Sequence, residues 1–259
     1  MLESFSVYMC SFQQERMIRV YLPKSYQEGA KRYPVLYMHD GQNVFEDEGA
    51  IKGVSLGLKD YLDEKSLEII VVAIDLNVEG EERINEYCPW LHGETAKEIL
   101  GYASASGGKG EEYLDFIISE LKPFIDRKYR TIENDTSMAG ISLGALISTY
   151  AACRYPHVFK KIAALSPGYY RNQENIEKFI AQSDLTGVEK FYMDFGTKEL
   201  KEDDKLQNRF ATMISGVYEM LDKKIPDTKF ETIENGEHNY VSFKTRIPNV
   251  ISYLYSDLF

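Results

Sequence analysis

The sequence predicts an α/β fold, with a mostly parallel central sheet, an antiparallel N-terminal hairpin and helices on both faces. Three observations support this prediction. Two short β-rich segments open the chain, and buried apolar segments then alternate with segments of helical periodicity. A serine between two glycines, in Gly140-Ile141-Ser142-Leu143-Gly144, stands where an apolar strand gives way to an apolar helix. Strands that alternate with helices form a parallel sheet that helices cover on both faces.

The predicted strands are short segments rich in β-branched and aromatic residues and bounded by turn residues. FSVYM and MIRVYLP lie close together in the chain and predict the hairpin. The continuous apolar run YPVLYMHDG stops at Asp-Gly, which indicates a buried central strand. The other predicted strands are residues 67–76, 136–142, 159–168, 190–197 and 228–236.

The predicted helices repeat apolar residues at helical spacing. One of them begins with Glu111 and Glu112, which suit the positive end of a helix dipole. The last one contains Pro248, and we expect an interruption there because proline lacks a backbone N–H. The predicted helices are residues 58–66, 111–129, 143–156, 172–183, 206–224 and 239–259.

Residues 77–110 show neither the helical nor the strand period. This stretch contains the single tryptophan and the glycine-rich segment SASGGKG. Long irregular segments in compact domains commonly form binding loops or lids. SASGGKG resembles a phosphate-binding loop only loosely, because Lys109 is followed by glycine and not by Ser or Thr. We interpret it as a flexible hinge before the next helix.

Length and composition predict an ordinary globular protein. The chain has 259 residues, of which 44% are hydrophobic and 27% charged. It shows no internal repeat, low-complexity linker or compositional break, so we expect residues 1–259 to form one domain. The three cysteines, Cys10, Cys88 and Cys153, are scattered and odd in number, and we therefore expect no disulfide framework.

Charge and hydropathy restrict the classes of partner. The net charge of −11 disfavours nucleic acid, because an acidic chain repels phosphates. The N-terminal segment has an acid at position 3 and lacks the continuous apolar region of a signal peptide. No window reaches the apolar length of a membrane span. We therefore expect a cytoplasmic protein that binds neither nucleic acid nor membrane. Its oligomeric state is left open.

Polar residues follow several predicted strands at their carboxyl ends, where open α/β sheets bind ligands. Ser142 ends one such strand, Glu199, Asp203 and Asp204 follow a later one, and His238 follows the last. Serine, acid and histidine occur in this order in the catalytic triad of α/β-hydrolases, whose serine lies in a G-x-S-x-G turn. A serine hydroxyl needs a base to take its proton, and the base needs an acid to orient it. We predict that Ser142 is the nucleophile and His238 the base.

The acid has several candidates. Glu199 lies closest to the strand end and is favoured. Asp203 and Asp204 lie further along a charged loop, and Asp194 lies within the strand. The amide of Leu143 follows the nucleophile and is expected to face the oxyanion that develops during acyl transfer.

The remaining histidines have weaker interpretations. His39 ends a central strand and is expected to shape the oxyanion loop. His92 lies in the irregular segment and is a candidate substrate contact. His157 follows a helix and is interpreted as structural. Because the chain has no H-E-x-x-H or H-x-H pattern, we expect no metal ion.

Seven motifs resemble the putative-esterase family of α/β-hydrolases: YMHDGQNVF, NEYCPW, YLDFIISELKPFIDRKYRT, MAGISLGAL, ALSPG, DFGTKE and GEHNYVSF. That family includes S-formylglutathione hydrolases, feruloyl esterases, siderophore esterases and mycolyltransferases. The resemblance extends over nearly the whole chain from about Arg16. It implies hydrolysis of ester or thioester bonds without a cofactor.

The resemblance also assigns roles to individual residues. Ser142 matches the nucleophile and His238 the base, and Glu199 falls where many members place Asp or Glu. Gln42 matches the position whose backbone amide is the second oxyanion donor, beside that of Leu143. This chain has HDGQN where some members have a His-Gly pair, so the oxyanion loop differs in sequence.

The segment INEYCPW falls where enzymes of this family build the pocket wall. One interpretation is that Tyr87 and Trp90 stack on an acyl or aryl group of the substrate. The other is that Trp90 only anchors a long loop. The sequence leaves both open.

We therefore predict a serine carboxylesterase that acts on a small-molecule ester through an acyl-enzyme intermediate, without cofactor or metal. An acyltransferase would use the same residues, with an alcohol in place of water. An alternative of another class is a non-catalytic hydrolase-fold protein that binds a ligand, and the intact serine, histidine and acid argue against it. The sequence leaves the substrate open among siderophore esters, short-chain glycerides, acetylated sugars and other esters.

Overall fold

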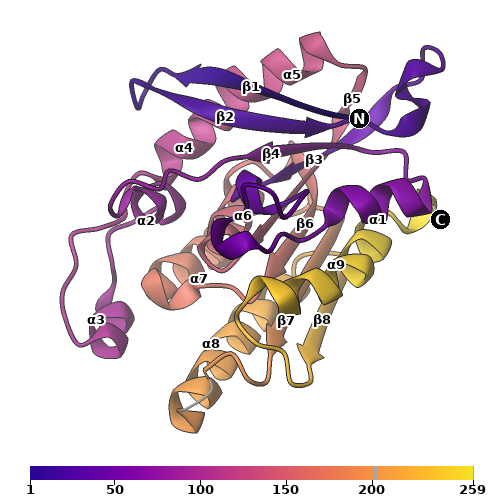
Figure 1. Cartoon of the computed structure of the whole chain (residues 1–259). Helices are drawn as coiled ribbons and strands as arrows, with labels where there is room; N and C mark the ends of the chain where they lie inside the picture. Colours follow the sequence, from indigo (N-terminus) through magenta and orange to yellow (C-terminus); the bar gives the residue numbers. More distant parts are fainter. Residues whose placement is uncertain (201–202, 259) are drawn as a thin grey trace.

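The computed structural model of the protein describes residues 1–200 and 203–258. Within these residues, eight strands form one sheet in the order β1-β2-β4-β3-β5-β6-β7-β8 (Figure 1). The strands are β1 (Leu2–Met9), β2 (Gln14–Tyr21), β3 (Tyr33–Met38), β4 (Ile70–Ile74), β5 (Thr131–Ile141), β6 (Phe159–Leu165), β7 (Lys190–Gly196) and β8 (Asp227–Ile233).

The strand directions confirm the predicted sheet. β1 and β2 form the N-terminal hairpin, with Phe5 opposite Ile18. β2 also runs antiparallel to β4, whereas every following pair from β4–β3 to β7–β8 is parallel. The hairpin is thus joined edge-on to a parallel sheet, and the carboxyl ends of β3, β5, β6, β7 and β8 meet at one edge.

Helices cover both faces of this sheet, as predicted (Figure 1). Alternate residues of a central strand supply two separate apolar clusters, because side chains alternate across a strand. In β4, Val72 and Ile74 join the cluster under the helices from α4 to α8, and Val71 joins the cluster under α1 and α9. The helices are α1 (Leu58–Lys65), α2 (Glu82–Tyr87), α3 (Glu94–Leu100), α4 (Gly110–Phe116), α5 (Lys122–Lys128), α6 (Leu143–Arg154), α7 (Gln173–Gln182), α8 (Asp204–Asp222) and α9 (Tyr240–Leu254).

Two expectations about the helices need correction. The segment 77–110, which lacks a clear period, contains the short helices α2 and α3. The helix α9 continues through Pro248 without interruption. Proline within a helix costs about 3 kcal/mol. In total, five apolar side chains of α9 are buried, some before and some after Pro248. Each contributes roughly 1.5–3 kcal/mol, so their burial outweighs the lost backbone hydrogen bond.

The described residues contain no helix that is both long and apolar enough to cross a membrane.

The chain between α4 and α5 is also helical, but Ile117–Leu121 forms a π-helical turn. The predicted helix at 111–129 is therefore confirmed in extent and contains one local irregularity.

A buried ion pair attaches α2 to the sheet. Arg16 on β2 donates from Nη2 to Glu86 Oε1 at 2.6 Å and from Nη1 to Glu86 Oε2 at 2.8 Å. Its Nη1 also donates to the carbonyl of Asp75, just after β4, at 3.1 Å. Arg16 is 4% exposed and Glu86 is fully buried. Each charge therefore depends on the other for compensation, since neither has water as an alternative partner.

Replacing Arg16 with Met is expected to lower the free energy of unfolding by roughly 3–5 kcal/mol, because Glu86 becomes an uncompensated buried charge. Urea unfolding followed by circular dichroism measures this. The double variant Arg16→Met, Glu86→Leu is expected to recover most of the loss, because it removes both charges. A single variant with the unfolding midpoint of the wild type would contradict this account.

Candidate active site

The chain turns sharply at Ser142, between the end of β5 and the start of α6. Ser142 has φ 59° and ψ −116°, a conformation that costs a non-glycine residue of the order of 1–3 kcal/mol. Its carbonyl accepts hydrogen bonds from the amides of Ala145, Leu146 and Gly168 at 3.1, 3.2 and 2.9 Å. Its own amide donates to Leu165 at 3.0 Å. The turn is thus held by bonds to α6 and to the end of β6.

The glycines around Ser142 follow from this geometry. A Cβ on Gly140 would overlap the carbonyl group of Gly144 and would lie 2.9 Å from the amide nitrogen of Ala145. A side chain at Gly140 would therefore push α6 away from β5. The first glycine of G-x-S-x-G is therefore needed because α6 packs very close to β5.

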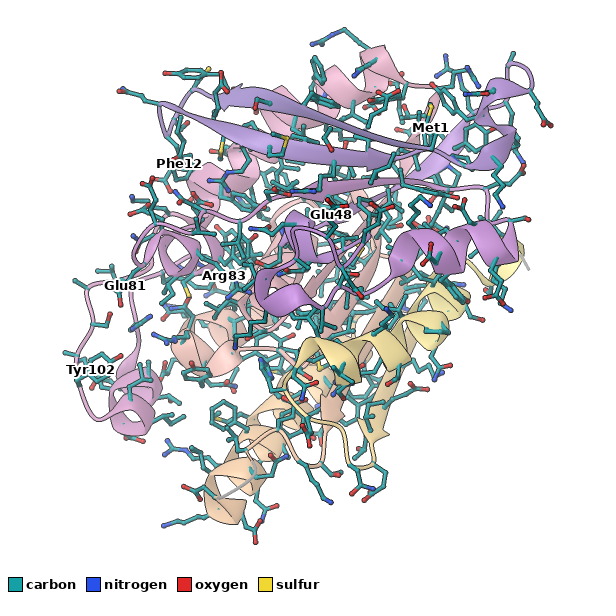
Figure 2. The ribbon with its side chains drawn as sticks, viewed as in Figure 1. Met1, Phe12, Glu48, Glu81, Arg83 and Tyr102 are labelled. Atoms are coloured by element: carbon teal, nitrogen blue, oxygen red, sulfur yellow. The ribbon has the colours of Figure 1, made fainter. Side chains whose placement is uncertain are left out.

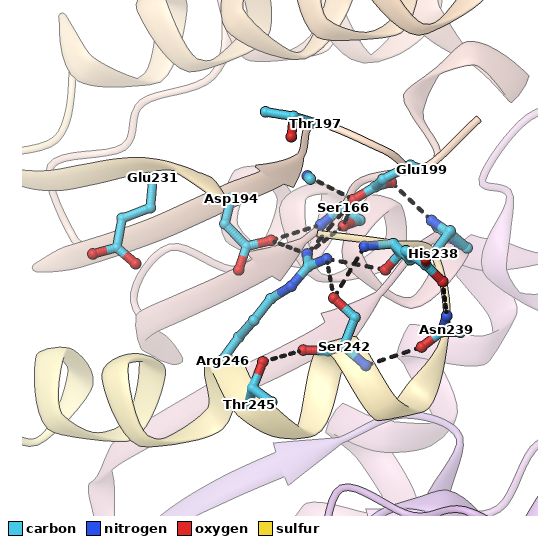
Figure 3. A network of polar contacts seen from close by, with 12 residues as sticks. Ser166, Asp194, Thr197, Glu199, Glu231, His238, Asn239, Ser242, Thr245 and Arg246 are labelled. Atoms are coloured by element: carbon cyan, nitrogen blue, oxygen red, sulfur yellow. Dashed lines mark hydrogen bonds and ion pairs between the residues drawn. The ribbon is translucent and has the colours of Figure 1, made fainter. Parts of the chain in front are cut away.

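His238 and Glu199 meet at the carboxyl ends of the last two strands. Nδ1 of His238, between β8 and α9, donates to Oε2 of Glu199, just after β7, at 2.9 Å (Figure 3). Oε1 of Glu199 accepts from the Gly196 amide at 2.7 Å and from the hydroxyl of Ser166. The Glu199 side chain is 4% exposed, whereas that of His238 is 39% exposed. The carboxylate is fixed in the interior, and the imidazole reaches the surface of the site.

The other acid candidates have different partners. Asp203 caps α8 and accepts from the Leu206 amide at 2.8 Å. Asp204 lies exposed in the first turn of that helix. Asp194 is fully buried against Arg246, and burial raises its pKa to about 6 although the guanidinium opposes this. Among the four acids that the sequence singles out, Glu199 is the one that contacts His238.

Ser142 and His238 line two adjoining hollows. The larger, of about 760 Å³, has mostly apolar walls that include Ile51, Val54 and Val241. The smaller, of about 270 Å³, also reaches Glu199. Within the described residues, no hydrogen bond joins the Ser142 hydroxyl to His238, and catalytic hydrogen bonds often tighten only when a substrate is bound. Both side chains nevertheless face the same space, into which a substrate carbonyl can enter.

Two backbone amides, one just after β5 and one just after β3, have no hydrogen-bond partner within the described part of the chain. The described residues offer no hydrogen-bond acceptor to the amide of Leu143, the first residue of α6, or to that of Gln42, just after β3. The first amides of a helix are unpaired within the helix and carry its positive dipole. The side chain of Gln42 accepts from the Leu76 amide at 2.9 Å, which fixes the loop.

An arginine that no sequence motif marks holds this loop. Arg83 on α2, labelled in Figure 2, donates from Nε and Nη2 to the two carboxylate oxygens of Asp40 at 2.7 and 2.8 Å. Asp40 has φ 56° and immediately precedes Gly41-Gln42. Arg83 also lines the larger hollow. A lone arginine in an irregular segment gives no signal of its partner, so only the packing of α2 reveals this pair.

The three predicted substrate contacts, Tyr87, Trp90 and His92, pack against other parts of the protein. Tyr87 is fully buried and accepts from the Asp40 amide at 3.2 Å, a position that does not favour stacking on substrate. None of the described residues that line the two hollows beside Ser142 is Tyr87, Trp90 or His92. Trp90 packs edge-on against Tyr150, with ring centroids 5.1 Å apart, which favours the interpretation that it anchors the loop. His92 is bonded to Arg171, with Nη1 3.0 Å from Nε2.

His39 directly follows β3 and lies next to the loop that carries Gln42. It is buried, its Nδ1 lies 2.9 Å from the hydroxyl of Tyr113, and burial lowers its pKa to about 4. His39 is not among the described residues that line the two hollows, and its enclosed imidazole packs under the loop after β3. His238, in contrast, is exposed and lines both hollows beside Ser142.

This arrangement agrees with a comparison against known protein families. Residues 10–252 match the family described as "Putative esterase". The chain belongs to this family. Membership in this family supports hydrolysis of ester bonds. The match extends over almost the whole chain.

Individual relatives match the chain over most of their own length. The YbbA protein of Bacillus subtilis strain 168 is 28% identical over 246 residues, which cover 93% of this chain and 92% of YbbA. An IroE-like serine hydrolase from Shewanella oneidensis has a TM-score of 0.79 at 18% identity, over 99% of this chain and 81% of that one. The siderophore hydrolase EstA from Aspergillus nidulans has a TM-score of 0.74 at 18% identity, over 96% and 93%.

Glu199→Gln is expected to lower kcat on an activated ester by up to about 10⁴-fold, because an amide no longer holds the imidazole in the required tautomer. Asp203→Asn and Asp204→Asn are matched controls and are expected to stay near the wild-type rate, since asparagine also caps helices well. Steady-state kinetics of the three variants decides this. A collapse in either control with Glu199→Gln unaffected would reassign the acid, and three mild effects would indicate a serine–histidine dyad.

Proposed function

We propose that the protein is a serine carboxylesterase, formed by a single catalytic domain over residues 1–259, with Ser142, His238 and Glu199 as its catalytic triad. The observation that carries this proposal is the 2.9 Å bond from His238 Nδ1 to buried Glu199, with His238 and the strained Ser142 facing one hollow. That bond leaves Nε2 of His238 as the nitrogen available to take a proton.

The reaction follows from these positions. The Ser142 oxygen attacks the ester carbonyl while His238 Nε2 takes its proton. The carbonyl oxygen becomes an oxyanion, and the free amides of Gln42 and Leu143 donate to it; one such donor is typically worth about 3–4 kcal/mol of barrier. The tetrahedral intermediate collapses, and His238 returns the proton to the leaving alcohol. Water, activated by His238, then releases the acid from Ser142.

The larger hollow supports an ester with a bulky apolar group. Its volume of about 760 Å³ is typical of sites for small molecules. Most of its walls are apolar, and Arg83 adds a fixed polar group. EstA, which shares the fold, is a siderophore hydrolase. A panel of p-nitrophenyl esters of increasing chain length, with one feruloyl, one acetyl-sugar and one siderophore ester, distinguishes these substrate classes.

Ser142→Ala is expected to abolish ester hydrolysis, with a loss in kcat of the order of 10⁶-fold, and to leave the fold intact. A fluorophosphonate probe is expected to label the wild type and not the variant, because labelling requires an activated serine. Ser183→Ala, which removes a hydroxyl bonded to Phe179 at the end of α7, is the matched control.

Two outcomes would overturn the serine mechanism. One is a Ser142→Ala variant that retains more than about a tenth of the wild-type rate, since loss of the nucleophile cannot cost so little. The other is a wild type that the probe does not label and that hydrolyses no ester of the panel, which would favour a binding protein. Product analysis with an added alcohol separates hydrolysis from acyl transfer.

EDTA treatment is expected to leave the rate of ester hydrolysis unchanged, because the proposed steps need only protein groups. Within the described part of the chain, no three His, Cys, Asp or Glu side chains gather as possible metal ligands. The measurement compares rates before and after chelation and after addition of Zn²⁺ or Ca²⁺. A large loss that either ion restores would contradict the proposal.

A further inference from the structure

The helix α9 places a fully buried arginine behind the acid–base pair (Figure 3). The Arg246 side chain is 1% exposed. Its Nη1 donates to the hydroxyl of Ser166 at 2.8 Å and to Oδ1 of Asp194 at 3.0 Å, and lies 3.5 Å from Oε1 of Glu199. One guanidinium therefore faces two buried carboxylates.

The same guanidinium also contacts the segment that carries His238. Its Nη2 donates to the carbonyl of Glu237 at 3.1 Å and to the hydroxyl of Ser242 at 3.0 Å. Arg246 thus bonds to the residue immediately before the base and to the neighbours of the acid. Its planar, rigid fork fixes both sets of contacts relative to each other, which a flexible lysine ammonium cannot do.

The direction of the Ser166 hydroxyl follows from the chemistry of its partners. A guanidinium only donates hydrogen bonds, so the Ser166 oxygen must accept from Arg246. Its one proton is then free to donate to Oε1 of Glu199. Since the Gly196 amide donates to that same oxygen, Oε1 is fully engaged, and Oε2 is the oxygen left for His238.

We propose that Arg246 is a positioning residue for the proposed esterase reaction: it acts through Ser166 to aim the Glu199 carboxylate at His238. This inference rests on the proposed function. A purely structural role would need only an ion pair with Asp194, and it would not explain the relay through Ser166 or the bond to Glu237. The role is not catalytic in the strict sense, because Arg246 touches neither substrate nor nucleophile.

Two conservative variants test it. Ser166→Ala removes only the relay hydroxyl, and Arg246→Lys keeps the charge but loses the fork. Each is expected to lower kcat about tenfold, with KM within about twofold of the wild type. In proton NMR, the strongly deshielded His238 Nδ1–H signal is expected to weaken or broaden. Lys161→Met is the control, because it removes another buried cation, paired with Asp135 at 3.2 Å, and should leave both readouts unchanged.

A double-mutant cycle shows whether Arg246 acts through the acid. In the background of Glu199→Gln, the substitution Arg246→Lys is expected to cost less than about twofold in kcat, because the carboxylate that it aims is gone. The inference is overturned if both conservative variants keep wild-type kcat and the Nδ1–H signal, or if the effects of Arg246→Lys and Glu199→Gln simply multiply. Failure of the proposed function looks different, since Ser142→Ala and Glu199→Gln would then leave the rate intact.

Discussion

The backbone of Ser142 is the constraint on which the rest of the site depends. Its carbonyl accepts from Ala145, Leu146 and Gly168, so one residue ends β5, starts α6 and holds the loop after β6. The positive φ is maintained because three amides would lose their acceptor if it relaxed. The hydroxyl, the Leu143 amide and the start of the Ser166 loop are therefore positioned as one unit. Preorganisation of this kind is what electrostatic stabilisation of a developing charge requires.

Two arginines from distant parts of the chain orient carboxylates that the strand ends place at the site. Asp40 follows β3 and is held by Arg83 of α2, and Glu199 follows β7 and lies next to Arg246 of α9. Buried ion pairs seldom add net stability over well-packed apolar residues, because desolvation cancels most of their attraction. Their value here is directional: the strand ends give each carboxylate its position, and the guanidinium fixes its orientation.

The elements and the site differ in how far the sequence alone predicts them. Ser142 and Glu199 each follow a strand with a clear apolar pattern, and His238 follows a more polar strand. Parallel topology brings the ends of these strands together, so the proximity of the three residues is predictable. The partner of an arginine depends on how a short helix such as α2 packs, and no local pattern records that. The same limit explains Tyr87, whose burial follows from the orientation of α2. Pro248 shows the converse, since tertiary burial there overrides a strong local preference.

The charges around the site are arranged for the charge separation that the proposed reaction creates. On the histidine side, two carboxylates, Asp194 and Glu199, face a single guanidinium, so this group of three side chains carries a net charge of one negative unit when both acids are ionised. On the opposite side, Arg83 neutralises Asp40, and the amides at the start of α6 present a positive dipole. An imidazolium forming at the first place and an oxyanion at the second are each stabilised by fixed groups of opposite sign. Because these groups are already in place before substrate binds, little reorganisation is required as the charges develop.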